Sequence, residues 1–394
     1  MSVSDWSGTS LPWDMELARV KGLLGPLFRR SEPRQQIALY FEGLIGSAER
    51  KNGWQLAEHA GDAVPWRMQA LLGRTVWDEE RARDICRDYT LEQLGDPDGV
   101  LVVDETGFIK KGQHSVGVSR QYSGTAGRIE NCQVGVFLSY ASRHGHALID
   151  RRLYLPKEWA EAVDRREAAR VPDDVVFTTK PKIAAAMIAQ ALDAGVFCAW
   201  VLGDAVYGSD KRLRVMLEER EKPYVLAVRS DERFMMAGFK TQTAEALADA
   251  VGEQDWSRLP AGAGSKGPRL YDWARVRLFR LQSPPWDHWL LIRRSIAKPQ
   301  ERAYYVTYGP DATELKELAA VAGLRWTIEE CFQSAKGEAG FDHYEARSWH
   351  GWHRHITLSM LALAFLAGLR SRLKQAQSDD DPSKPNKRSL SAAA

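Results

Sequence analysis

Between residues 100 and 228 the sequence alternates short apolar runs with amphipathic stretches, and this alternation limits the choice of fold most. The apolar runs VLVVDE (100–105), FCAWVLGD (197–204) and PYVLAV (223–228) have the length and composition of strands buried on both faces. KPKIAAAMIAQALDAGV (180–196) and KRLRVMLEER (211–220) instead repeat apolar residues every three or four positions, as helices do.

Two further strands are expected between the first apolar run and the first helix. HSVGVSRQY (114–122) and CQVGVFLSY (132–140) are separated by SGTAG, whose glycines favour a tight turn. The order is then three strands, a helix, a strand, a helix and a strand. Such an order predicts an α/β core built on a mixed sheet.

The pattern changes on both sides of this core. Residues 14–95 have helical periodicity between Arg and Lys residues, which predicts several short helices in a separate N-terminal domain. The alternative is an ordinary helical bundle with a solvated basic face. From about residue 231, β-like alternation replaces the α/β pattern. The expected divisions are residues 1–96 for the N-terminal domain, 97–230 for the first part of the core, 231–302 for a β-rich insertion, 303–376 for the helical second part of the core, and 377–394 for a charged, disordered tail.

The composition excludes several classes of protein. A net charge of +2 gives no global basic field, so a nucleic-acid partner must be held by local patches. The four cysteines lie far apart without C-x-x-C spacing, which argues against a disulfide framework or a cysteine zinc site. LSMLALAFLAGL (358–369) is too short to span a bilayer, and the N-terminus lacks a secretory pattern. We expect a cytoplasmic protein with no membrane partner.

Three acids occupy comparable places in this arrangement. Asp104 ends the first core strand, Asp204 ends the fourth, and Glu329 lies on a late helix. Carboxylates at strand ends can converge at one edge of an α/β sheet, and their oxygens suit Mg²⁺ or Mn²⁺. Two such ions about 3.5–4 Å apart support phosphodiester cleavage. Glu105 and Asp210 are the alternatives to the two aspartates, because strand neighbours face opposite sides.

In the helical stretch RWTIEECFQSAK (325–336), the two adjacent glutamates point in different directions around the helix axis. With Arg325 at zero, Glu329 falls at about 40° and Lys336 at about 20° around the helix, whereas Glu330 falls at about 140°. Glu329 therefore shares a stripe with two cations at the edge of the core. The alternative is a simple intrahelical ion pair between residues four apart.

These segments together resemble a known family. VVDETGF (102–108), WVLGDAVYG (200–208) and the 325–336 helix resemble the DDE-type insertion-sequence transposases, which have a ribonuclease-H-like core. The resemblance extends over nearly the whole chain, through LYFEGLIGSAERKNGWQLAE (39–58) and FDHYEARSWHGWHRHITLSMLALAFL (341–366). It is closest to the branch whose core is interrupted by a β-rich insertion.

That branch has the third motif Y-x2-R-x3-E-x6-K. Arg325, Glu329 and Lys336 fit its spacing, whereas Ala322 stands at the tyrosine position, so a tyrosine-dependent DNA contact is in doubt. The resemblance implies that Glu329 is the third metal ligand and that Arg325 and Lys336 hold phosphates near the active site. The alternative for Lys336 is a solvated helix cation.

For the whole chain, the resemblance implies a ribonuclease-H-like fold and a DNA transposase. Asp104, Asp204 and Glu329 would hold two Mg²⁺ or Mn²⁺ ions for strand cleavage and transfer. The partners would be the inverted terminal repeats of an insertion sequence, the target DNA, and further copies of the chain on paired ends. The alternatives are a same-fold endonuclease without strand transfer and a non-catalytic, domesticated DNA-binding protein, against which the three intact acids argue.

The expected insertion interleaves aromatic residues with arginines. Trp273, Trp286 and Trp289 lie near Arg293 and other arginines, a combination that suits backbone contact and stacking on an unpaired base. We hypothesise that at least one of these tryptophans stacks on a displaced base. The alternative is a tryptophan core with a solvated basic face.

Overall fold

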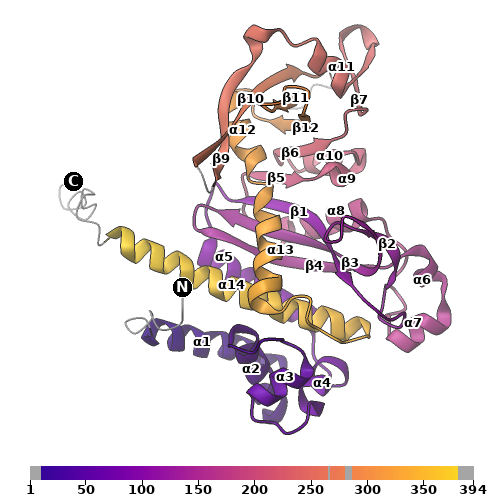
Figure 1. The fold of residues 1–394 in the computed structure, drawn as a ribbon, viewed down its shortest axis with the longest axis vertical. Coiled ribbons are helices and arrows are strands. Elements are labelled where there is room, and N and C mark those ends of the chain that lie inside the picture. Colours follow the sequence, from indigo (N-terminus) through magenta and orange to yellow (C-terminus); the bar gives the residue numbers. More distant parts are fainter. Residues whose placement is uncertain (1–9, 265–266, 280–285, 380–394) are drawn as a thin grey trace.

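The computed structural model describes residues 10–264, 267–279 and 286–379, and within them one mixed sheet of ten strands carries helices on both faces (Figure 1). In pairing order the strands are β2 (Ser119–Ser123), β3 (Arg128–Ser142), β1 (Val100–Ile109), β5 (Trp200–Gly203), β6 (Tyr224–Val228), β12 (Arg302–Gly309), β11 (Asp287–Arg294), β10 (Gly267–Arg277) and β9 (Ser257–Gly264), and β4 (Gly145–Tyr154) pairs with β3. The β1–β5 and β5–β6 pairs are parallel and the others are antiparallel. The predicted α/β class with a mixed sheet is confirmed.

Alternate side chains of β1 enter different cores on the two faces of the sheet. Val100 and Val102 pack with the helices α13 and α14, whereas Leu101 and Val103 pack with α8 and α10. These helices are α8 (Lys180–Asp193), α10 (Lys211–Glu219), α13 (Trp326–Ala339) and α14 (Trp349–Asp379). Because strand residues alternate with a period of two, the same rule assigns residue 104 to the α13 face and residue 105 to the α8 face.

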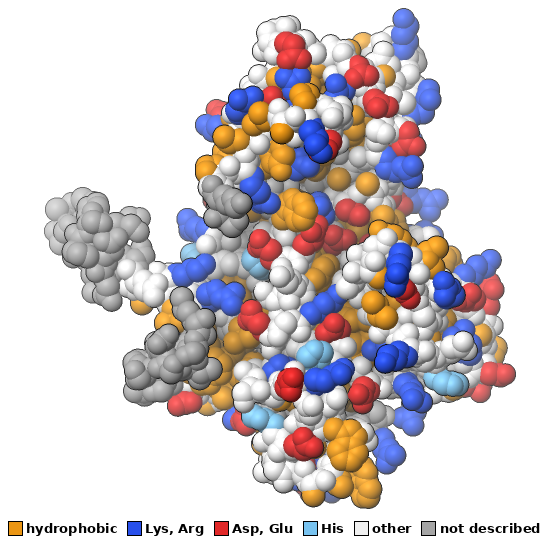
Figure 2. Space-filling model, viewed as in Figure 1, with side chains coloured by type: hydrophobic (Ala, Val, Ile, Leu, Met, Phe, Trp, Pro, Cys, Tyr) orange, Lys and Arg blue, Asp and Glu red, His pale blue; other side chains and the backbone are white. Residues whose placement is uncertain are grey.

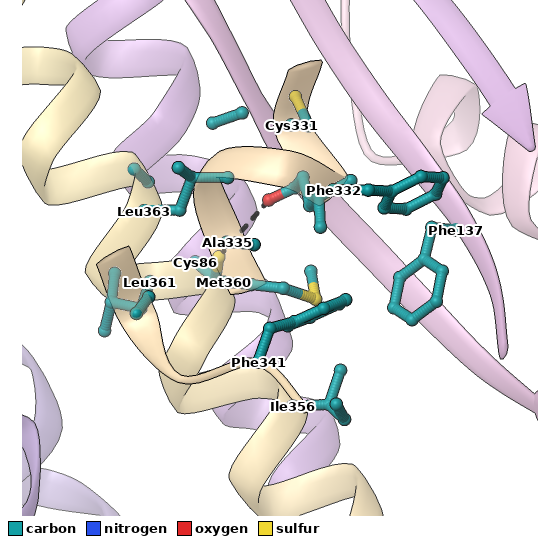
Figure 3. Packing of buried hydrophobic residues seen from close by; sticks show 14 of the residues in the cluster. Cys86, Phe137, Cys331, Phe332, Ala335, Phe341, Ile356, Met360, Leu361 and Leu363 are labelled. Atoms are coloured by element: carbon teal, nitrogen blue, oxygen red, sulfur yellow. Dashed lines mark hydrogen bonds between the residues drawn. The ribbon is translucent and has the colours of Figure 1, made fainter. Parts of the chain in front are cut away.

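Aromatic packing fixes α13 against the sheet. Phe137 of β3 lies 5.5 Å from the Phe332 ring and 5.1 Å from the Phe341 ring, measured between centroids. Figure 3 shows these rings beside Met360 and Ile356 of α14. Burial of several such side chains contributes about 1.5–3 kcal/mol each. The orientation of α13 over the sheet therefore rests on this cluster.

The N-terminal helices pack beneath the sheet around α14, as Figure 1 shows. They are α1 (Ser10–Leu24), α2 (Ser31–Ile45), α3 (Gly53–His59), α4 (Trp66–Gly73) and α5 (Glu79–Leu94). α2, α4 and α5 each contact α14. The side chains of Asn52 and Asp78 accept backbone N–H bonds at the starts of α3 and α5, which is the role that helix N-caps have in sequences of this kind.

The C-terminal helix is longer than its apolar run. α14 spans 31 residues and is, within the described part of the chain, the one helix long and apolar enough to cross a membrane. However, 72% of its apolar window is buried inside the protein, so it serves as the central core helix. His355 lies within it, where its Nδ1 is 2.7 Å from the Tyr40 hydroxyl and its Nε2 is 2.9 Å from the Gly340 carbonyl oxygen. The charged tail expected from residue 377 begins inside this helix, and residues 380–394 lie outside the described residues.

Two features of the sheet differ from the sequence-based expectation. β4 was not expected, because its sequence GHALIDRRLY mixes charged with apolar residues; its Arg151 is nevertheless fully buried. The expected 114–122 strand is shorter, beginning at Ser119.

The strands β9, β10 and β11 of the expected insertion also extend the main sheet. They join it through β12, which pairs with both β11 and β6 and begins the range expected to be helical. The remaining elements are α6 (Lys157–Glu161), α7 (Val163–Ala169), α9 (Ala205–Gly208), β7 (Arg233–Met235), β8 (Thr241–Thr243), α11 (Ala244–Asp249) and α12 (Leu315–Gly323). β7 and β8 form a small separate sheet.

Candidate active site

Two aspartates follow equivalent positions on neighbouring parallel strands. Val103 of β1 is paired with Gly203 of β5, so Asp104 and Asp204 are the next residues along the two strands. Residue parity places both on the α13 face of the sheet. β5 ends at Gly203, and Asp204 caps α9 by accepting the Val206 N–H at 2.8 Å. The predicted convergence of these two carboxylates is therefore a consequence of strand register.

The electrostatic environment of this pair is unfavourable to negative charge. Burial, and then repulsion by Asp204 and Glu105, raises the pKa of Asp104 to about 8. Burial and repulsion by Glu105 also raise the pKa of Asp204. Figure 2 shows acidic side chains gathered midway along one face, over the region where α13 passes the sheet. The positive charge of Arg325 offsets only part of this effect, and a bound cation would offset more of it.

The two alternative acids have other partners. Glu105 points to the α8 face, where its carboxylate accepts from Lys180 Nζ at 2.7 Å and from the Tyr207 hydroxyl at 2.5 Å. Asp210 caps α10 by accepting the N–H groups of Arg212 and Leu213. Both acids are therefore committed to contacts within the protein.

Arg325 links the third acid to the pair. Its Nη2 lies 3.0 Å from Glu329 Oε1, and its Nη1 lies 3.6 Å from Asp104 Oδ2. Glu330 is turned away, with 63% of its side chain exposed and its Oε2 3.8 Å from His146 Nε2. The helix separates the two glutamates as its geometry requires, and the intrahelical ion pair considered for Arg325 and Glu329 is present.

A complete metal-binding cluster is not assembled in this conformation. Among the described residues there is no group of three or more His, Cys, Asp or Glu side chains placed to hold one metal ion. Asp104 and Asp204 provide two hard oxygen ligands at one place, whereas Glu329 is paired with Arg325. The two aspartates, whose negative charge Arg325 offsets only in part, fit a divalent cation, since carboxylate oxygens are the ligands that Mg²⁺ prefers. Glu329 would have to leave Arg325 to complete the set.

Lys336 is fixed to the sheet near the same site. Its Nζ donates to the Thr106 and Thr125 hydroxyls, both at 3.0 Å, and lies 3.5 Å from the Gly107 carbonyl oxygen. Burial lowers the pKa of Lys336. The lysine is therefore not the solvated helix cation considered from the sequence, because it joins α13 to β1 and to the turn after β2.

Two of the three tryptophans proposed to stack on DNA are core residues, which corrects that expectation. Trp273 is fully buried and stacks on Tyr305 with centroids 6.2 Å apart, and Trp289 is 4% exposed. The cause is that both side chains belong to the buried cluster that also holds Tyr305 and residues of α12. Trp286 is half-buried beside Tyr308, and Arg293 lies over the Tyr271 ring at 4.4 Å. Trp286 alone of the three keeps an accessible surface.

Several residues of the site were not foreseen from the sequence. Lys180 and Tyr207 hold Glu105, and Thr106 and Thr125 hold Lys336. For Tyr207 there was a local signal. It follows Asp204 by about one helical turn, and a residue at that spacing on a short helix points back toward the strand. The contacts of Lys180 and Thr125 join segments far apart in the sequence and gave no local signal.

Comparison with known proteins gives two family matches and one curated relative. The model described as "DDE superfamily endonuclease" matches residues 23–252, more than half of the chain. The model described as "Transposase DDE domain" matches residues 175–365. The "Probable transposase for insertion sequence element IS701" of Microchaete diplosiphon is 25% identical over 312 residues, which cover 77% of this chain and 74% of that protein. The matched ranges together include all three acids and the arginine between them.

Proposed function

Because the chain belongs to the DDE superfamily endonucleases, as a transposase of the insertion-sequence type, we propose that it cuts the ends of an insertion sequence and joins them to target DNA. Its partners are then the inverted terminal repeats, the target DNA and further copies of the chain on paired ends. The observation that carries this proposal is the register that sets Asp104 beside Asp204 on adjacent parallel strands, with Arg325 linking Asp104 to Glu329.

The sheet supports a ribonuclease-H-like core for this activity. β1 lies between an antiparallel neighbour, β3, and a parallel one, β5. Asp104 lies in the middle of this central strand, beside the point where its parallel neighbour β5 ends and Asp204 follows. In this proposal residues 97–230 and 303–376 form the core, residues 1–96 bind DNA, and residues 231–302 form the inserted part.

Asp104 and Asp204 would hold Mg²⁺ or Mn²⁺, with Glu329 as the third ligand. DDE superfamily nucleases generally use divalent ions, and a pair of such ions activates water and stabilises the leaving oxygen in phosphodiester cleavage. The protein's own contribution is to hold two carboxylates at fixed positions on rigid strands. The Lys180–Glu105–Tyr207 contacts hold the adjacent residue of β1 on the opposite face, which keeps the Asp104 backbone in place.

Arg325 and Lys336 have different roles in this proposal. Arg325 pairs with Glu329 and lies near Asp104. Its planar guanidinium can exchange a carboxylate for a phosphate of the DNA, which would release Glu329 toward the aspartates. Lys336, tied to two threonines, positions α13 over β1 and keeps a positive charge beside the site. Trp286 is the tryptophan that remains available for stacking on a displaced base.

The test is cleavage and joining of a labelled DNA end by alanine variants. Asp104→Ala, Asp204→Ala and Glu329→Ala should each abolish cleavage and leave end binding largely intact, because the acids act on the reacting phosphate while basic groups hold the DNA. Glu330→Ala is the matched control and should be mild. Loss of cleavage in Glu330→Ala with normal cleavage in Glu329→Ala would contradict the assignment.

The same assay separates the related functions. Cleaved ends without joined products in the unsubstituted protein would indicate an endonuclease without strand transfer. End binding without cleavage at any Mg²⁺ or Mn²⁺ concentration would indicate a DNA-binding protein without catalysis.

A further inference from the structure

A cavity of about 690 Å³ lies away from the acids, between the N-terminal helices and the core. Its lining comes from α4, from the end of α7, and from the segment that precedes α14. In Figure 1, α4 and α7 lie in the lower part of the molecule, whereas β1 and α9 lie above them. The cavity is therefore a second site, distinct from the one that holds Asp104 and Asp204.

Positive charge dominates the lining. Arg74, Arg170 and Arg347 all line the cavity and are all exposed, and no Asp or Glu is among the described residues that line it. Within the described part of the chain, Arg170 donates to the Gly73 carbonyl oxygen, and none of these three guanidinium groups has a carboxylate partner within 4.0 Å. Elsewhere on the face shown in Figure 2, basic and acidic side chains are intermixed. Three unpaired arginines around one cavity form a site for an anion.

The backbone holds these arginines in place before any ligand binds. Arg170 has the left-handed conformation (φ 55°, ψ 46°), which an arginine adopts at a cost in free energy. Its Nη1 donates to the Gly73 carbonyl oxygen at 2.8 Å and so joins α7 to α4. The Arg347 carbonyl oxygen accepts the Val116 N–H at 2.9 Å. The site is thus built from segments that the fold ties together.

An aromatic side chain lies beside the charges. Trp66, at the start of α4, lines the cavity with 71% of its surface exposed. An exposed large aromatic residue next to unpaired guanidinium groups suits a ligand with both phosphates and flat or apolar faces. DNA has this chemistry, with its phosphodiester backbone beside sugars and bases.

We propose that this cavity binds the phosphodiester backbone of DNA outside the cleaved bond, through Arg74, Arg170 and Arg347, with Trp66 against a sugar or base. The inference rests on the proposed function, in which DNA is the substrate. It explains how a chain with a net charge of only +2 holds DNA, since the charge that matters is concentrated at one place. It also places a DNA contact on both sides of the boundary between the N-terminal helices and the core.

The test is DNA affinity as a function of salt, measured by fluorescence anisotropy in EDTA so that cleavage plays no part. The variant is Arg74→Gln/Arg347→Gln, because these two side chains have no described structural hydrogen bond, whereas Arg170 bonds to Gly73. The control is Arg212→Gln/Arg233→Gln, which removes the same charge from exposed arginines on α10 and β7. Thermal unfolding of both variants should match that of the unsubstituted chain.

The cavity variant should bind DNA about tenfold to a hundredfold more weakly at 0.1 M salt. Its slope of log affinity against log salt should be shallower by about 2, since each lost phosphate contact reduces the slope by about 0.9. The control should change little. Trp66→Ala should weaken binding about fivefold or more, and Trp54→Ala, which removes a tryptophan that is 52% exposed outside the cavity, should not.

Equal affinity and slope in the cavity and control variants, with normal binding by the unsubstituted chain, would overturn this inference and leave the proposed function standing. Failure of the unsubstituted chain to bind any DNA would overturn both. Weaker binding of inorganic phosphate by the cavity variant, with unchanged DNA affinity, would show a small-anion site and would also overturn the inference.

Discussion

Removing the charge of one active-site acid should make the metal-free protein more stable. Burial and the negative charges of Asp204 and Glu105 raise the pKa of Asp104 from 3.8 to about 8. Ionising the Asp104 carboxyl at neutral pH therefore costs free energy in the folded state but not in the unfolded state. Asp104→Asn keeps the shape of the side chain and the oxygen that accepts the Glu105 N–H at 2.7 Å, but it removes the charge.

The sign and size follow from proton linkage. A carboxyl whose folded-state pKa lies above its unfolded value destabilises the fold as pH rises from 3.8 toward 8, and has no effect below 3.8. At 1.36 kcal/mol for each pKa unit, the cost is about 4 kcal/mol at pH 7. We expect Asp104→Asn to raise the free energy of unfolding by about 2–4 kcal/mol at pH 7, and by progressively less toward pH 4.

The assay is urea unfolding in EDTA at pH 7 and pH 4.5, followed by a Mg²⁺ titration at pH 7. Asp210→Asn is the control and should change stability little, because asparagine caps a helix about as well as aspartate does. Mg²⁺ should stabilise the unsubstituted chain, since a ligand of the native state adds RT ln(1 + [L]/Kd), and should stabilise Asp104→Asn much less. If Asp104→Asn proved less stable than the unsubstituted chain in EDTA at pH 7, the reasoning about uncompensated charge would be refuted.

Three further predictions concern other parts of the molecule. Burial lowers the pKa of His355 to about 3, so the stability that depends on its neutral form is present above about pH 6.5 and is lost as pH falls. Between pH 8 and pH 5, the free energy of unfolding of His355→Gln should therefore fall by about 2 kcal/mol less than that of the unsubstituted chain. Trp273→Ala should lower the free energy of unfolding by about 3–5 kcal/mol in urea titrations. Trp286→Ala should leave the fold intact and slow cleavage of the second DNA strand after the first has been cut, because stacking on a displaced base would act after binding. Normal cleavage of both strands by Trp286→Ala would exclude a stacking role. Lys180→Met should lower the free energy of unfolding by about 1–3 kcal/mol because Glu105 is left without its cation, and an unchanged urea midpoint would contradict this.

The sequence was sufficient to propose the acids of the site because the relevant signals are local. Asp104 and Asp204 each follow an apolar run. The expectation that each acid ends its strand holds for Asp204, which follows β5, but is wrong for Asp104, because β1 continues to Ile109. The angle of about 100° per residue separates Glu329 from Glu330 in any α-helix, whatever surrounds it. The choice between Asp104 and Glu105 could not be made in the same way, because alternation gives opposite faces without saying which face meets α13.

Contacts between distant segments could not be predicted in this way. The sequence left two alternatives open for Trp273 and Trp289, base stacking and a tryptophan core, because aromatic residues and arginines lie close together in their strands. The same pattern arises when a strand inside a sheet packs aromatic residues on one face and carries cations at its rim. β4 was missed for a related reason, since its Arg151 is buried through bonds to Glu80 and to the Glu79 carbonyl oxygen on α5.

The sequence by itself determined the α/β class, the mixed sheet and the faces on which single side chains lie, because these depend on periodicity within one element. The tertiary structure alone decided that Arg325 bridges Glu329 and Asp104, that Lys336 is held by two threonines, and that the arginines of three separate segments surround one cavity. Each of these depends on which elements lie side by side. That choice is made by packing of large buried surfaces between segments hundreds of residues apart, and no local pattern records it.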